Sequence, residues 1–173
     1  MKVLFTMMIA LMLYACSDDG LIVRDYKFDS QDINQVKTAA AQGDAGAMFE
    51  LGMGYMGTGM VEEDYKQGMS WLTKSAEKGD VLAQSTLGNL YLSDKIPVKG
   101  AQNHVQDFSK ARYWFEKGAE KNDGMSQLGL ATIYSKGLGV AKDDKIASEW
   151  LRKAKANRDN VTISSDLMYT SGK

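Results

Sequence analysis

The sequence predicts an all-α fold, a right-handed alpha-alpha solenoid of helix–turn–helix repeats, and two recurring patterns lead to this prediction. The first pattern occurs three times: Asp44/Ala47/Leu51/Gly52/Tyr55, Asp80/Ala83/Leu87/Gly88/Tyr91 and Asp123/Ser126/Leu130/Ala131/Tyr134. The second pattern follows each copy of the first: Asp64/Trp71/Lys74, Asp107/Trp114/Lys117 and Asp143/Trp150/Lys153. A fixed period of this kind indicates stacked repeats. One seven-residue insertion between Tyr91 and Asp107 accounts for the only break in the period.

The first half of each repeat has the spacing of a helix. In the first copy, Ala47, Leu51 and Tyr55 are four residues apart and therefore form one stripe on a helical face. Gly52 lies beside this stripe, although glycine inside a helix costs about 1 kcal/mol relative to alanine. Its return as Gly88 therefore predicts that a neighbouring helix packs too closely for a larger side chain.

The second half of each repeat is predicted to be a second, antiparallel helix. It starts at an aspartate whose carboxylate can accept hydrogen bonds from the free N–H groups of the first turn: Asp64, Asp107 and Asp143. Glycine pairs are predicted to end the preceding helix with positive φ angles: Gly57 and Gly59, Gly137 and Gly139. A tryptophan follows each aspartate by seven residues, so the three indoles are interpreted as core residues. Truncation of such a residue to alanine should cost about 3–5 kcal/mol.

These residues resemble the Sel-one-like repeat family, short-period relatives of the tetratricopeptide repeats. The first copy matches the family pattern from Gly43 to Ala76, and the third copy keeps the closing turn Gly137–Val140. The resemblance covers about residues 42–155 and implies two antiparallel helices in each repeat. Lys155 stands where the family has alanine, which is typical of the end of an array.

The N-terminal residues predict a lipoprotein signal. Lys2 precedes an apolar run, Val3–Ala15, which is shorter than the roughly 20 residues of a membrane-spanning helix and has the length of a signal-peptide core. The run Leu13–Cys16 resembles a bacterial lipobox, which implies cleavage before Cys16 and lipidation of its thiol. The alternatives are an ordinary signal peptide and an uncleaved anchor with a buried cysteine. Where residues 1–15 are retained, we expect a helix that projects without joining the core.

The predicted organisation has five parts: a signal peptide (1–15), a lipidated cysteine and tether (16–29), an N-terminal cap helix (30–42), three repeats (43–157) and a C-terminal tail (158–173). The insertion Ser93–Val105 is expected to form a surface loop because it interrupts the repeat period. For the C-terminal part, a loose tail is favoured over a strand at Val161–Ile163 because Ser, Thr, Asp and Asn dominate it.

The composition argues against nucleic-acid binding and against a fold held by disulfide bonds. The 21 basic and 22 acidic residues give a net charge of −1, so the chain lacks the basic excess typical of nucleic-acid binding. The single cysteine excludes an internal disulfide, so stability must come from helix packing.

No residue is predicted to be catalytic, and neither a cofactor nor a metal is expected. His104 has no second histidine or further cysteine as a co-ligand and is interpreted as a surface histidine. Glu62, Glu63 and Asp64 place carboxylates together, as glycosidases require, but a helix cap with solvated loop charges explains them fully. The glycine pairs follow no predicted strand and do not form the GxGxxG pattern of a phosphate loop.

The remaining class is protein binding through the concave face, which first helices mainly line. The positions beside the core stripe are the predicted partner-binding residues: Phe49, Glu50, Met53, Ser85, Asn89, Leu128 and Thr132. Phe49 and Met53 are apolar where the repeat does not require it, and aromatic anchors dominate many interfaces. Two interpretations remain open for this pair: contact with a partner, or contact with the preceding cap helix.

The leading hypothesis is a non-catalytic, membrane-tethered protein-protein interaction module of the bacterial envelope. Its partner is another protein: a delivered toxin if the chain is an immunity protein, or an envelope component if it is a scaffold. The lipid on Cys16 would be its only membrane contact, and similarity to enterobacterial sorting implies the outer membrane, facing the periplasm, because Ser17 follows the cysteine. The competing hypothesis is a hydrolase acting on β-lactam or cell-wall material, with Glu62, Glu63 and His104 as the residues to test.

Overall fold

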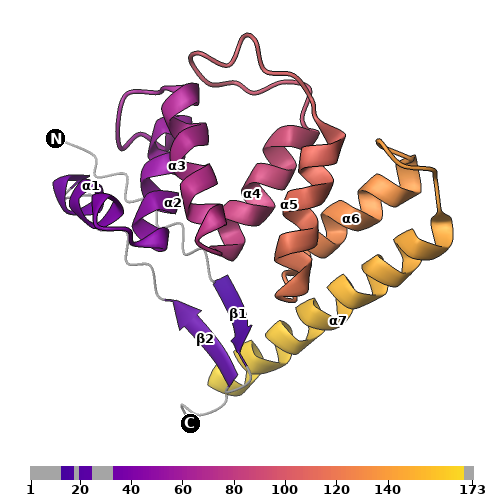
Figure 1. The fold of residues 1–173 in the computed structure, drawn as a ribbon. Helices are drawn as coiled ribbons and strands as arrows, with labels where there is room; N and C mark the ends of the chain where they lie inside the picture. The colour runs from indigo at the N-terminus through magenta and orange to yellow at the C-terminus, as the bar shows by residue number, and fades with distance from the viewer. Residues whose placement is uncertain (1–12, 18–19, 25–32, 170–173) are drawn as a thin grey trace, which may run out of the picture.

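The computed structural model describes residues 13–17, 20–24 and 33–169, with the side chains of residues 33–157. Most of the predicted signal peptide (residues 1–12) and the second half of the predicted tether (25–29) lie outside the described residues. Helices dominate what is described (Figure 1): α1 (Ile33–Ala41), α2 (Ala45–Met53), a π-helical turn (Gly54–Thr58), α3 (Tyr65–Glu77), α4 (Val81–Leu92), α5 (Phe108–Glu120), α6 (Gly124–Lys136) and α7 (Asp144–Tyr169). The all-α solenoid is confirmed.

Each repeat is a pair of helices joined by a short loop: α2 with α3, α4 with α5, and α6 with α7. Each helix packs on the one before it in the chain, so α1 covers the start of the first pair, as predicted for a cap helix. The close approach predicted at the repeated glycine is also confirmed. A Cβ added to Gly52 would lie 2.8 Å from Leu72 Cγ, and one added to Gly88 would overlap the ring of Phe115.

The buried side chains of residues 33–157 form three clusters along the array. The first joins α1 to α2 around Leu51, the second joins the first two repeats around Leu72 and Leu87, and the third joins the last two repeats around Phe115. Of the three tryptophans, Trp114 is buried at 8% exposure. Trp71 and Trp150 are half-buried, and the ammonium groups of Lys74 and Lys153 lie 4.3 and 4.1 Å from their ring centroids. The indoles therefore pack against the core, but only the middle one is enclosed by it.

Aspartates cap the helices as the sequence predicts. The carboxylates of Asp64, Asp107 and Asp143 accept hydrogen bonds from the backbone N–H three residues later, at 3.1, 2.9 and 2.9 Å. The first pattern contains a further set of caps that was not predicted: Asp44, Asp80 and Asp123 accept the corresponding bonds at 2.7, 2.9 and 2.7 Å. Both repeated patterns in the sequence therefore mark helix starts.

Two of these caps respond oppositely to pH. Burial raises the pKa of the Asp123 carboxyl, whereas the backbone N–H and ammonium of Lys110 lower the pKa of Asp107. A carboxyl group whose pKa is raised in the folded state stabilises the fold below its unfolded pKa, and this contribution is lost as the pH rises through the folded-state pKa. A carboxyl group whose pKa is lowered stabilises the fold above its unfolded pKa. Asparagine caps as well as aspartate but carries no charge.

We therefore expect Asp123→Asn to raise the thermal unfolding midpoint at pH 7, and Asp107→Asn to lower it. Thermal unfolding of both variants and the parent, followed by circular dichroism between pH 3 and 7, measures the difference. The difference for Asp123→Asn should shrink as the pH falls from the raised folded-state pKa toward about 3.9, the unfolded pKa of aspartate. The difference for Asp107→Asn should shrink only as the pH falls below about 3.9. Equal shifts of the same sign at pH 7 would contradict the assignment.

The C-terminal tail is the main correction to the predicted architecture. Residues 158–169 continue α7 as a helix, so the prediction of a loose tail is wrong, as is the strand considered there. We call α2, α4 and α6 first-type helices, and α1, α3, α5 and α7 second-type helices. The second-type helices α1, α3 and α5 end because a residue with positive φ precedes the next cap: Gly43 (φ 97°), Gly79 (φ 91°) and Asn122 (φ 61°). The equivalent position is Arg158. Arginine does not favour the left-handed conformation, so the helix is not ended there.

A second correction concerns the N-terminal region. Residues Leu13–Ser17 (β1) pair antiparallel with Gly20–Arg24 (β2), with Cys16 opposite Leu21. Residues 13–15 are therefore extended, not part of a projecting helix. The start of the predicted tether is extended as well, as a strand of this hairpin. Within the described ranges, none of the helices combines the length and apolarity that crossing a bilayer requires.

Candidate functional site

The predicted binding residues on α2 are covered by the protein itself. Phe49 and Met53 are half-buried and pack against the cluster around Leu72, Ala83 and Leu87. This cluster belongs to the junction with the second repeat, so their apolar character is explained by that junction. Neither of the two interpretations above foresaw this contact.

The equivalent residues of the second repeat differ in exposure. Ser85 is only 4% exposed, and its hydroxyl donates to backbone carbonyls within α4, so its prediction as a surface residue is wrong. Asn89 is exposed. Glu50, on α2, is half-buried, and burial together with the Asp44 carboxylate raises the pKa of its side chain.

The last repeat leaves its copies of these positions open. Leu128, equivalent to Phe49 and Ser85, is 41% exposed, and Thr132 is partly exposed with its hydroxyl donating to Leu128 O at 3.0 Å. Leu151 is 54% exposed, although its equivalents Leu72 and Phe115 are fully buried. The sequence contained the signal for Leu151, since it follows the repeated tryptophan directly, but only the stacking shows that nothing covers it.

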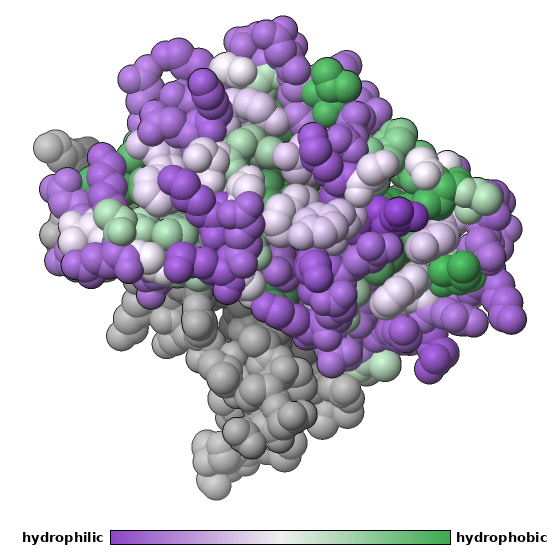
Figure 2. Space-filling view, viewed as in Figure 1, coloured by the Kyte–Doolittle hydropathy of each residue, from purple (hydrophilic) through white to green (hydrophobic). Residues whose placement is uncertain are grey.

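We call this surface the end face. It comprises the six residues of α6 and α7 whose equivalents in the first repeat pack against the second: Leu128, Thr132, Ser135, Ser148, Leu151 and Lys155. In the first repeat the same six positions hold Phe49, Met53, Met56, Met69, Leu72 and Ala76. The end face therefore combines two exposed leucines with three hydroxyl side chains and one ammonium. Figure 2 shows a largely hydrophilic surface on which apolar side chains form separate spots, several of them on the side of α6 and α7.

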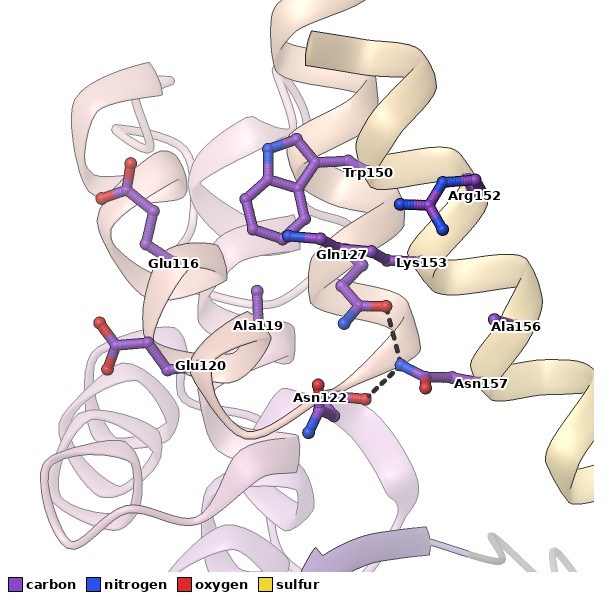
Figure 3. A pocket seen from close by; sticks show the side chains of 10 residues that line it. All are labelled: Glu116, Ala119, Glu120, Asn122, Gln127, Trp150, Arg152, Lys153, Ala156 and Asn157. Carbon is purple, nitrogen blue, oxygen red and sulfur yellow. Dashed lines mark hydrogen bonds between the residues drawn. The ribbon is translucent and has the colours of Figure 1, made fainter.

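A groove of about 590 Å³ lies between α5 and α7, with α6 beneath it (Figure 3). Carboxylates of Glu116 and Glu120 line its α5 side, and Arg152 and Lys153 belong to α7. The Asn157 amide closes one end by donating to Asn122 O at 2.8 Å and to Gln127 Oε1 at 2.9 Å.

The Asn157 contact is part of the repeat architecture. In the preceding junction, Lys121 Nζ donates to the carbonyl of Gly79 at 2.6 Å, and Gly79 is the turn residue equivalent to Asn122. Both residues thus tie one second-type helix to the turn of the previous repeat. The groove therefore arises from repeat stacking, and the carboxylates of Glu116 and Glu120 that line it pair with Arg112 and Lys117 of α5.

His104 fastens the insertion to the first repeat. Its Nε2 lies 3.1 Å from Ser93 O, which can only accept, so Nε2 donates and Nδ1 accepts from the Tyr65 hydroxyl at 2.6 Å. Tyr65 N also donates to Lys99 O at 3.0 Å, and the Lys99 ammonium pairs with Glu62 at 2.5 Å. The predicted surface loop is confirmed, but His104 is half-buried and joins that loop to the start of α3.

We expect His104→Ala to loosen the insertion without unfolding the array, because a hydrogen bond of this kind contributes about 0.5–1.5 kcal/mol. Amide hydrogen exchange of residues 93–107 should accelerate several-fold, while exchange in α5 stays unchanged. Tyr65→Phe, which removes only the hydroxyl, should reproduce most of the effect. Faster exchange throughout α3–α6 would show that the histidine supports the array itself.

The other groups considered for chemistry have structural roles. Glu63 Oε2 accepts from the backbone N–H of Lys99 at 3.3 Å. The glycine pairs end helices with φ between 67° and 99°, as predicted. Among the residues whose positions are described, no group of three or more His, Cys, Asp or Glu side chains is arranged to hold a metal ion.

Comparisons with known proteins agree with the repeat architecture. The Sel1 repeat matches residues 45–80, 96–123 and 124–159. A Sel1 repeat protein from Oxalobacter formigenes has a crystal structure with TM-score 0.65 and 31% sequence identity, covering 78% of this chain and 98% of that one. The protein c5321, a protective antigen of uropathogenic Escherichia coli strains with an SLR fold, gives TM-score 0.65 and 30% identity over 73% of this chain and 26% of that one.

No curated protein matches the chain. The three matched segments nevertheless cover more than half of it. The first and third segments start at the first residues of α2 and α6, whereas the second starts at residue 96, after α4, and covers α5. The chain therefore belongs to the Sel1 repeat family, whose repeats serve as modules of protein–protein interaction.

Proposed function

We propose that this protein is a lipid-anchored, non-catalytic protein-binding module of the bacterial envelope. The observation that carries the proposal is the exposure of Leu128 and Leu151 at repeat positions that are covered elsewhere in the array. Single exposed apolar residues are common on protein surfaces; Leu128 and Leu151 differ in that a neighbouring repeat covers the same repeat positions in the interior junctions. Repeat solenoids provide such sites on extended, rigid surfaces.

The anchoring part of the proposal is supported by the sequence around Cys16. Leucine three residues before the cysteine and alanine directly before it resemble a lipobox. A single acyl chain gives weak, reversible membrane binding, whereas two or more give stable anchoring. The diacylated cysteine of a lipoprotein would therefore hold the repeats at the membrane surface, and Ser17 favours the outer membrane.

Two roles fit such a tethered module. As an immunity protein, it would occupy the active surface of a delivered toxin and neutralise it in the periplasm. As a scaffold, it would hold an envelope component near the membrane. The structurally similar protective antigen of uropathogenic E. coli strains is a bacterial protein with an SLR fold, which supports the bacterial setting.

The anchor is tested by expressing the full chain in a Gram-negative host fed with an alkyne-bearing fatty acid. We expect the parent to incorporate the label and to fractionate with the outer membrane, and Cys16→Ser to lose both. Label that persists in Cys16→Ser would contradict lipidation at this cysteine.

The binding role is tested by capturing envelope and secreted proteins with the chain from Ser17 to Lys173. We expect one protein to be recovered in a near-stoichiometric amount. Co-expression with the captured protein then separates the roles, since only a toxin inhibits growth when the module is absent. No enrichment over blank resin, or a hydrolytic activity that Glu62→Gln, Glu63→Gln and His104→Ala remove, would overturn the proposal.

A further inference from the structure

The interior junctions show what kind of element covers the positions of the end face. In the junction between the second and third repeats, α6 lies across α5, and a Cβ added to Gly129 would lie 2.5 Å from Phe115 Cζ. Asp123, which caps α6, and Ser126 in the first turn of α6 lie over Gly118 near the C-terminal end of α5. The covering helix therefore runs antiparallel to the helix it covers, with its aspartate cap over that helix's last turn.

The end face differs from the interior junctions chiefly in charge. Lys155 takes the position of Ala76 and Ala119, which are 2% and 7% exposed. It lies near the point where the N-terminus of a further antiparallel helix would rest. The opposite end of the α7 face carries Asp144, which pairs with Lys142 at 3.2 Å. Among residues 33–157, Lys155 forms no ion pair, and its side chain is exposed.

We propose that the end face is a docking site for an amphipathic helix of the partner protein, which would lie antiparallel to α7 as a further first-type helix. This rests on the proposed function and specifies its surface. Complementarity with Lys155 and Asp144 requires acidic side chains in the first turn of that helix and basic ones in its last turn, which its dipole also favours. Small or apolar side chains at i, i+3 and i+4 would cover Leu128 and Leu151.

The chain's own C-terminal residues do not supply this helix. For the chain to add a further repeat here, it would need a turn at Arg158, but α7 continues to Tyr169 instead. Residues 158–169 therefore do not fold back over the end face as a separate helix, and we assign the docked helix to another molecule. The hydroxyl groups of Thr132, Ser135 and Ser148 give the face a polar rim around two leucines, the pattern of a reversible interface.

The probe is a fluorescent peptide with the sequence of residues 123–136 of this chain, held helical by a staple on its exposed side. It starts with Asp123, ends with Lys136 and covers the equivalent face of α5 in the intact protein. The receptor is the chain from Ser17 to Lys173. It keeps every buried cluster of the array, since these consist of residues between Ile33 and Trp150.

Fluorescence anisotropy should show saturable binding that Leu151→Asp weakens by about tenfold or more, since burying a leucine contributes about 1.5–3 kcal/mol and 1.4 kcal/mol is tenfold. Lys155→Glu should also weaken binding, and a peptide with Asp123→Lys should restore it. Val105→Asp is the matched control: Val105 is 76% exposed but remote in the insertion, and this change should have no effect.

No binding to the parent, or equal binding to Leu151→Asp, would overturn this proposal. A parent dimer in sedimentation equilibrium that Leu151→Asp dissociates would also overturn it, since it would assign the face to a second copy of the chain. If the peptide fails while the captured protein still binds, the proposed function stands and only the docking site is wrong. Circular dichroism must show unchanged helicity in each variant.

Discussion

Phe115→Ala is expected to lower the free energy of unfolding by about 3–5 kcal/mol, the range for truncating a fully buried phenylalanine. The ring has no exposed surface and lies between Gly88 of its own repeat and Gly129 of the next. It therefore contributes to two helix contacts at once, one within a repeat and one between repeats. Removal of the ring leaves a cavity between Gly88 and Gly129, which have no side chains that could fill it.

Leu151→Ala is the matched control because Leu151 occupies the same repeat position. Its side chain is 54% exposed, so its truncation should change stability by no more than about 0.5 kcal/mol, as for most surface substitutions. Chemical denaturation with urea, followed at 222 nm, measures both variants. A loss above about 2 kcal/mol in Leu151→Ala would show that the end face is covered in solution and would contradict its role as an open site.

The contrast between these two residues explains what the sequence could predict. Helix pairs, caps and the close approach at Gly52 and Gly88 follow from periodicity and from the chemistry of single residue types, which act locally. The positions of Phe115 and Leu151 in the repeat are identical as well. Their burial differs only because a further repeat follows one and not the other.

The predicted binding residues differ in burial for the same reason. Phe49 and Met53 were judged by their position on one helix, where nothing in the repeat requires an apolar side chain. Their contact is with the next repeat, and such a contact depends on how helices from different repeats stack. Leu128, at the same position as Phe49, was predicted with them and lies on an open surface.

One further difference arises from non-local contacts, and another arises from a single residue. The partners of His104 are Tyr65, 39 residues away, and the carbonyl of Ser93, and no pattern in the sequence connects the three.

The helical continuation of α7 was predictable from Arg158, which stands where Gly43, Gly79 and Asn122 turn the chain. The polar composition of this segment favours a loose tail, but the residue at that single position lets the helix continue, so the prediction of a loose tail is wrong.

The tight packing around Phe115 predicts a second large effect, from a very small change. Gly129→Ala adds one methyl group within 2.5–2.6 Å of three ring carbons, closer than any van der Waals contact. Since the ring is enclosed on its other side by Gly88, it cannot move away. We expect a loss of about 1–3 kcal/mol from overpacking, although alanine favours a helix more than glycine does.

Gly124→Ala, in the same helix, is the control, because its new Cβ would have Ala154 O at 3.9 Å as its nearest neighbour. It should stabilise the protein by about 0.4–1 kcal/mol through the unfolded state. The double variant Gly129→Ala with Phe115→Leu should be more stable than the sum of the single changes predicts, since leucine lacks the ring atoms that the methyl group meets. Additive losses in this double-mutant cycle would mean that α6 shifts away from α5, and the junction would then be a less rigid template for a docked helix than the end face requires.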